Sequence, residues 1–135
     1  MIIVLQLERL GDIAQSHAAL QLASRQSERV VLVVHERYVD AARLLSPPAV
    51  EIRGAHGADV LSLQQSISNR EPGWLAAARR VSTALDLGGA EKIVNLGWDP
   101  VGLAVAGAFK EDQPQANLRG PRMTRRGERL FPGPH

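Results

Sequence analysis

The sequence predicts an α/β domain with a mainly parallel sheet and helices on both of its faces. Short and mostly apolar runs at 2–7, 30–34 and 92–96 are typical of strands that are buried on both faces. Segments with apolar residues at helical spacing separate these runs. Such alternation of strand and helix indicates parallel βαβ units with right-handed crossovers.

The predicted elements can be placed in chain order from their apolar patterns and their breakers. Strands are predicted at 2–7, 30–34, 50–53, 59–63 and 92–96, with an additional edge strand at 115–119. Helices are predicted at 12–26, 36–45, 74–85 and 100–109. Pro47 and Pro48 end the second helix, Gly88 and Gly89 end the third, and the polar segment 64–72 is predicted to be a loop.

The length and composition are those of a single globular domain. The chain has 135 residues, about one domain, with 44% hydrophobic and 22% charged residues, as in a globular protein. It has no cysteine, which excludes disulfides and thiolate metal sites. The longest aliphatic run, Val30–Val34, is too short for a membrane span, and the N-terminus lacks the basic region of a signal peptide. We therefore expect a cytoplasmic protein.

Charge and histidine spacing argue against two classes of site. The net charge is only +2, aromatic residues make up 4% of the chain, and the basic excess lies after residue 110. Nucleic-acid binding needs a denser basic patch with interleaved aromatic residues, so we expect no nucleic-acid partner. His17, His35, His56 and His135 do not have the spacing of metal ligands, so no metal site is predicted.

The first candidate site follows the first predicted strand, because ligands of parallel sheets bind at the carboxyl ends of strands. The loop 8–12 contains Gly11, which permits a tight turn or a close backbone approach to a ligand. Asp12 is a candidate N-cap of the next helix, in a capping box with Gln15, and a candidate general base at the mouth of a cleft; one side chain can fill both roles. The segment matches neither the dinucleotide fingerprint nor a Walker A loop.

The second candidate site follows the strand at 92–96. Asp99 before Pro100 is typical of an N-cap followed by proline at the first helical position. Trp98 is either an aromatic platform for a sugar ring or a core or lid residue. Asn95 either hydrogen-bonds a ligand hydroxyl or satisfies backbone groups at the strand end.

Several of these segments together resemble the N-terminal domain of glycosyltransferase family 9, the lipopolysaccharide heptosyltransferases. In the family an apolar strand is followed by a basic residue, Gly-Asp and then Pro-Ala-Leu, and a later strand ends in Asn-Leu before a polar loop. Ala18 replaces the proline of the family pattern. The matching segments are Arg9-Leu10-Gly11-Asp12, Ala19-Leu20, Lys92–Leu96, Gly97–Pro100 and Arg119-Gly120.

The resemblance implies a GT-B enzyme with two Rossmann-like domains. The N-terminal domain of such enzymes binds the acceptor, which is lipopolysaccharide inner core or its lipid A-linked precursor, and the C-terminal domain binds ADP-heptose. Asp12 would be the base of an inverting transfer, with no cofactor besides the nucleotide-sugar substrate. Arg9, Gly11, Asn95 and Trp98 would contact the acceptor, with Arg9 facing its carboxylates or phosphates. A solvated loop arginine is the alternative for Arg9.

The resemblance also implies a division of the chain. Residues 1–120 would form the Rossmann-like acceptor-side domain, and 121–135 a polar tail rich in proline and arginine. The C-terminal donor-binding domain would be absent, so the chain would be inactive alone or work with a separately encoded donor domain. The basic run from Arg119 to Arg129 is either a solvated tail or a peripheral contact with the anionic inner face of the inner membrane.

Two other functions remain open from the sequence. One is a non-catalytic binding module that keeps the same Rossmann-like fold. The other is a small Rossmann-like or flavodoxin-like regulatory domain, against which stands the lack of a phosphate-binding loop and of a receiver-like acidic cluster.

Overall fold

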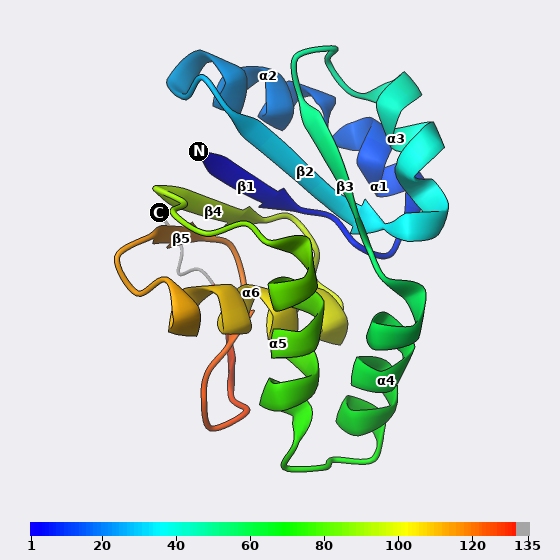
Figure 1. The fold of residues 1–135 in the computed structure, drawn as a ribbon, viewed down its shortest axis with the longest axis vertical. Coiled ribbons are helices and arrows are strands. Elements are labelled where there is room, and N and C mark those ends of the chain that lie inside the picture. Colours follow the sequence, from blue (N-terminus) through cyan, green and yellow to red (C-terminus); the bar gives the residue numbers. More distant parts are fainter. Residues whose placement is uncertain (132–135) are drawn as a thin grey trace.

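A computed structural model of the chain describes residues 1–131 and shows a Rossmann-like α/β fold. Five parallel strands form the sheet in the order β3-β2-β1-β4-β5 (Figure 1). The strands are β1 (Ile2–Leu5), β2 (Val30–His35), β3 (Glu51–Ala55), β4 (Lys92–Asn95) and β5 (Asn117–Arg119). The predicted edge strand is confirmed as β5.

Strand β1 is central and fully buried, as its apolar sequence predicts. Ile3 pairs with Val31 of β2 on one side and with Ile93 of β4 on the other, and its exposed fraction is 0%. The chain builds outward from β1 to β3 and then crosses to the other side of β1. The order of the strands therefore reverses between β1 and β4, which is where such sheets bind ligands.

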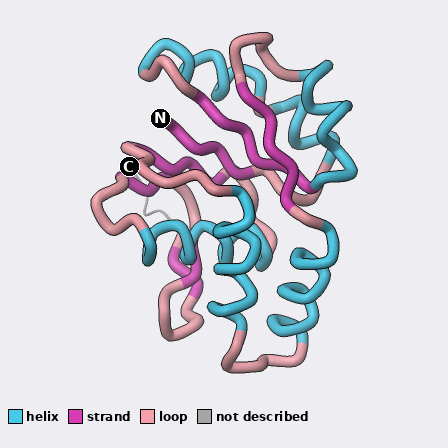
Figure 2. The backbone as a smooth tube through the Cα atoms, viewed as in Figure 1, coloured by secondary structure: helices cyan, strands magenta, loops and turns pink. Residues whose placement is uncertain are grey.

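Helices cover both faces of the sheet, because alternate residues of each strand point to opposite sides (Figure 2). Ile2 and Val4 pack with α1 (Leu10–Gln15), α2 (His17–Gln26) and α3 (Val39–Leu45). Ile3 and Leu5 belong to the opposite core cluster, with α4 (Gly57–Ser68), α5 (Trp74–Leu85) and α6 (Pro100–Asp112). A short 3₁₀ turn, η1 (Glu36–Tyr38), precedes α3. None of the helices within residues 1–131 combines the length and apolar character of a membrane span.

Two predictions of secondary structure are wrong around residue 60. The predicted strand at 59–63 and most of the predicted loop at 64–72 form helix α4. Val60 and Leu63 are buried while Leu61 is 54% exposed, which is the spacing of a helix face rather than of a strand. The turn to α5 is confined to the residues between Ser68 and Trp74.

The first predicted helix is two helices, and it begins earlier than expected. Helix α1 begins at Leu10, and α2 follows after a break at Ser16. The Ser16 hydroxyl donates to the carbonyl of Asp12 at 2.7 Å. Such back-bonding by serine bends helices, which accounts for the break.

The segment after residue 120, predicted to be a polar tail rich in proline and arginine, packs on the domain through a hairpin. Strands β6 (Arg122–Met123) and β7 (Arg129–Leu130) pair antiparallel, and Met123 is buried in the core cluster of α6. Gly107 of α6 permits this contact, since a Cβ there would collide with the backbone oxygen of Met123. The final residues of the predicted tail, 132–135, lie outside the described residues.

Candidate functional site

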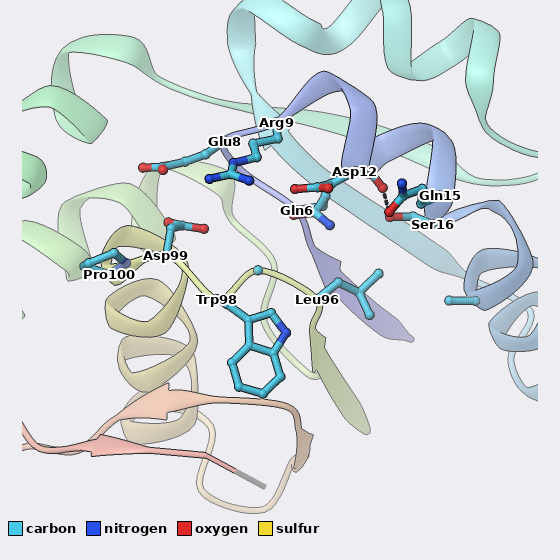
Figure 3. A pocket seen from close by; sticks show the side chains of 12 residues that line it. Gln6, Glu8, Arg9, Asp12, Gln15, Ser16, Leu96, Trp98, Asp99 and Pro100 are labelled. Carbon is cyan, nitrogen blue, oxygen red and sulfur yellow. Dashed lines mark hydrogen bonds between the residues drawn. The ribbon is translucent and has the colours of Figure 1, made fainter.

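A groove opens between the carboxyl ends of β1 and β4, where the strand order reverses. Helix α1 leaves β1 toward one face of the sheet and α6 leaves β4 toward the other, so their connecting loops diverge. The groove has a volume of about 790 Å³. Its lining residues come from these two loops and the helices that follow: Gln6, Glu8, Arg9, Asp12, Gln15, Ser16, Ala19, Leu96, Gly97, Trp98, Asp99 and Pro100 (Figure 3).

Asp12 lines the groove from the first turn of α1. The interpretation of Asp12 as N-cap in a capping box is wrong, because α1 begins at Leu10 and the N-cap position belongs to Arg9. Asp12 makes no capping hydrogen bond to the helix start, and its half-buried side chain points into the groove (Figure 3). A carboxylate in the first turn still benefits from the helix dipole, which favours negative charge there.

Arg9 is the cation of the groove. Its backbone is extended, with φ −128°, so the residue stands just outside α1, and its side chain is exposed. Arg9 takes part in none of the ion pairs found among residues 1–131. Its guanidinium faces the groove among the carboxyls of the same site (Figure 3). The positive charge of Arg9 acts on Glu8, where it opposes the rise of the pKa of that carboxyl.

Glu8 is a groove residue that the sequence interpretation missed. The amide of Gln64 donates to Glu8 Oε1 at 3.1 Å. Burial raises the pKa of the Glu8 carboxyl above its ordinary value, and the negative charge of Asp99 raises it further. The sequence shows that Glu8 and Asp99 each follow a predicted strand, and the structure adds that these two strands are neighbours.

Asp99 is the N-cap of α6, as predicted. Its Oδ2 accepts a hydrogen bond from the backbone amide of Gly102 at 2.8 Å, and Pro100 occupies the first turn. The cap holds this carboxylate at the groove wall opposite Glu8 (Figure 3). Two loops thus bring acidic groups to one end of the groove.

Trp98 stands at the rim of the groove with its indole 63% exposed. The ring is not a core residue, so the core alternative for Trp98 is wrong. It stacks on Phe131, with ring centroids 5.4 Å apart and planes inclined by 9°. Stacking against Phe131 leaves the other face of the indole as the one that a ligand ring can contact.

Asn95 and Gly11 lie outside the groove lining, and the interpretation of Asn95 as a residue that satisfies backbone groups is confirmed. Asn95 is buried, with Nδ2 donating to the Pro121 carbonyl at 2.7 Å and Oδ1 accepting from the Gly97 amide at 3.0 Å. It holds backbone groups in place behind the groove rather than lining it. Gly11 lies inside α1, outside the groove lining, and a Cβ there would meet nothing within 4 Å. No tight turn requires this glycine.

The structure thus brings Arg9, Asp12 and Trp98 together and adds Glu8 to them. The described residues contain no group of three or more histidine or acidic side chains placed to hold a metal ion. Comparison with known proteins finds no protein-family model and no curated protein that matches this sequence.

Proposed function

We propose that the groove binds the acceptor of a sugar-transfer reaction and that this chain is the acceptor-side domain of a family 9 glycosyltransferase. The observation that carries the proposal is the meeting of Asp12, Arg9 and Trp98 in one groove at the strand-order reversal. A carboxylate, a guanidinium and an exposed indole are groups that can bind and deprotonate a hydroxyl-bearing, anionic sugar acceptor.

In the proposed reaction, Asp12 accepts the proton of an acceptor hydroxyl as that oxygen attacks the anomeric carbon of ADP-heptose. The new bond joins the acceptor oxygen to the anomeric carbon, the bond from that carbon to the diphosphate breaks, and ADP leaves with its electron pair. The configuration inverts. A second domain, covalently attached or separately encoded, holds the donor in this scheme.

The acceptor is proposed to be lipopolysaccharide inner core or its lipid A-linked precursor. Arg9 pairs with its carboxylate or phosphate groups, since the planar guanidinium fits both in a bidentate manner. The indole face of Trp98 contacts a sugar ring. The proposal includes a cytoplasmic location at the inner face of the inner membrane, where a lipid-linked acceptor would be held.

Acceptor binding and transfer are tested separately. The chain is titrated with heptose-free lipopolysaccharide while tryptophan fluorescence is followed, and transfer from ADP-heptose is assayed with and without a donor domain. We expect saturable binding by residues 1–135 alone, no turnover alone, and turnover once a donor domain is supplied. The titration is run in a Trp74→Phe background, which leaves Trp98 as the single indole, so that the response comes from the groove.

Three outcomes separate the alternatives. Binding without transfer, even with a donor domain supplied, identifies a non-catalytic binding module with the same fold. The absence of any acceptor binding refutes the proposal for the groove. Turnover by residues 1–135 alone contradicts the need for a second domain. Asp40→Asn is the control for loss of a carboxylate elsewhere on the surface, and it should leave binding and transfer unchanged. Asp40 is a fully exposed residue of α3 that lies outside the groove.

A further inference from the structure

A second cavity, of about 370 Å³, lies between the α4–α5 turn and the β6–β7 hairpin. It shares no lining residue with the groove at β1 and β4. Three arginines line it: Arg70 from the turn, and Arg126 and Arg129 from the hairpin. Two segments far apart in sequence thus direct positive charge to one cavity.

The protein neutralises only part of the charge in this cavity. Glu71 is the one acidic residue among the described lining residues, and its Oε2 accepts a hydrogen bond from the Ser66 hydroxyl at 3.3 Å. Arg70, Arg126 and Arg129 take part in none of the ion pairs found within residues 1–131. A bound anion would be attracted by all three guanidinium groups.

Backbone hydrogen bonds hold both walls of the cavity. In the hairpin turn the Thr124 amide donates to the Glu128 carbonyl at 2.7 Å, and the Gly127 amide donates to the Thr124 carbonyl at 2.8 Å. In the α4–α5 turn the Glu71 amide donates to the Ser66 carbonyl at 2.9 Å. The cavity is therefore formed before a ligand arrives, which lowers the entropy cost of binding.

The cavity also has an apolar wall. Trp74, at the start of α5, lines it together with Ile67 and Pro72. A Cβ placed on Gly127 would lie 3.5 Å from the Trp74 indole nitrogen, so the hairpin packs directly against this ring. A purely inorganic anion would leave this wall without a partner.

We propose that this cavity binds a phosphate monoester that carries an apolar group. The arginines donate paired hydrogen bonds to the phosphate oxygens, and Trp74 contacts the apolar part. Such chemistry occurs in soluble phosphate esters and in anionic lipid headgroups. The inference is independent of the function proposed for the other groove.

The test follows the fluorescence of Trp74, which lines the cavity, to detect binding of a ligand there. The chain has two tryptophans, so the Trp98→Phe variant leaves Trp74 as the single indole. This variant is titrated with phenyl phosphate, and in a second arm it is sedimented with phosphatidylcholine vesicles with or without phosphatidic acid. We expect a saturable change of Trp74 fluorescence or selective sedimentation with phosphatidic acid, and either one weakens as salt is added.

Neighbouring arginines supply a matched pair of variants. Arg126→Ala should weaken binding about tenfold or more, because a charge-assisted hydrogen bond is lost. Arg125→Ala removes the same charge from the same turn at a position that does not line the cavity, and should change binding less than about twofold. Arg126→Lys keeps the positive charge but lacks the planar guanidinium that binds phosphate with two hydrogen bonds, and should give an intermediate loss of affinity.

The two arms identify the source of the phosphate. Response to phenyl phosphate alone indicates a soluble ester, and vesicle binding that Arg126→Ala removes indicates a lipid headgroup. The proposal is overturned if neither probe binds saturably, or if Arg125→Ala and Arg126→Ala weaken binding equally, since that result describes diffuse charge rather than a site. Circular dichroism of both variants checks that the hairpin variants remain folded.

Discussion

The indole of Trp98 lies flat on the phenyl ring of Phe131, with the planes only 9° apart, although both rings are more than half exposed. Trp98 belongs to the loop between β4 and α6, and Phe131 directly follows β7. The hairpin is therefore in contact with the rim of the groove as well as with α6. The orientation of Trp98 depends on a residue that comes from the end of the described chain.

Removing Phe131 should change the surroundings of Trp98. In a Trp74→Phe background, Phe131→Ala should shift the emission of Trp98 to longer wavelength, because the stacked indole face becomes solvated. The unfolding free energy should fall, with about 0.5–1.5 kcal/mol of the loss coming from the aromatic pair itself and the rest from the area that Phe131 buries. Leu130→Ala, at the exposed neighbouring residue, is the control and should leave the emission unchanged. Identical spectra for wild type and Phe131→Ala would contradict the stack.

Asp99→Asn should lower the pKa of Glu8 without uncapping α6. Asparagine caps as well as aspartate, so the bond to the Gly102 amide is retained. The Glu8 pKa should fall, because the negative charge of Asp99 that raises it is removed while its burial is unchanged. Carbon NMR of the Glu8 carboxyl measures this titration, with Asp40→Asn as the control. An unchanged Glu8 pKa would show that the two carboxyls do not interact.

The same pair makes stability depend on pH in a defined direction. With its pKa raised on folding, Glu8 keeps its proton in the folded state to a higher pH than in the unfolded chain. This contribution to the unfolding free energy is fully present below the ordinary value of 4.5 and is lost as the pH rises through the raised pKa. Glu8→Gln should abolish that loss in urea unfolding measured across this window. A loss of the same size in the variant would assign it to another group.

Alanine at two glycines should act in opposite directions. Gly107→Ala places a Cβ against the Met123 carbonyl oxygen and should cost about 1–3 kcal/mol, as overpacking does. Gly11→Ala meets nothing within 4 Å on helix α1 and should add up to about 1 kcal/mol of unfolding free energy. Urea unfolding measures both. Equal effects of the two substitutions would mean that Gly107 is not a close-approach site.

Substitution of Asp12 tests its proposed role as the general base. In the enzyme reconstituted with a donor domain, Asp12→Asn should lower turnover on the order of 10²-fold or more, since an amide cannot accept the acceptor proton. Asp12→Asn and Asp12→Ala should each cost only about 0.3–1 kcal/mol, from the lost charge in the first turn of α1. No cap bond distinguishes the two variants, because Arg9 holds the N-cap position. Near-full turnover of Asp12→Asn would refute the base assignment.

Elements that are buried on both faces were predictable from sequence. The apolar runs of β1 and β2 are rich in β-branched residues and are typical of strands in the middle of a covered sheet. Helix α4 was missed because Val60, Leu61 and Leu63 form a run too short to distinguish period 2 from period 3.6. The hairpin was missed because its residues are polar. The only sign of it was indirect: α6 has no polar face from Val101 to Phe109, and such a helix requires cover on every side.

The candidate site was predictable as far as it follows from topology. Arg9, Asp12 and Trp98 meet because the loops after neighbouring parallel strands share one edge of the sheet. No capping residue in the sequence marks where α1 begins, because its N-cap position is held by Arg9, which makes no side-chain cap bond. The burial of Asn95 depends on the Pro121 carbonyl, and the contact of Phe131 depends on where the hairpin docks. Such pairings join distant segments, and no local pattern records them.

The central place of β1 has a consequence for the synthesis of this chain. One edge of β1 pairs with β2 soon after both have been made, but the other edge pairs with β4, which begins at Lys92. At about 5–20 residues per second, translation of the intervening residues 36–91 takes roughly 3–11 s. Throughout that interval the emerging chain presents an apolar strand with open amide and carbonyl groups, a template on which a second nascent chain can pair. The order of the strands therefore makes co-translational chaperone binding most valuable before β4 has left the ribosome.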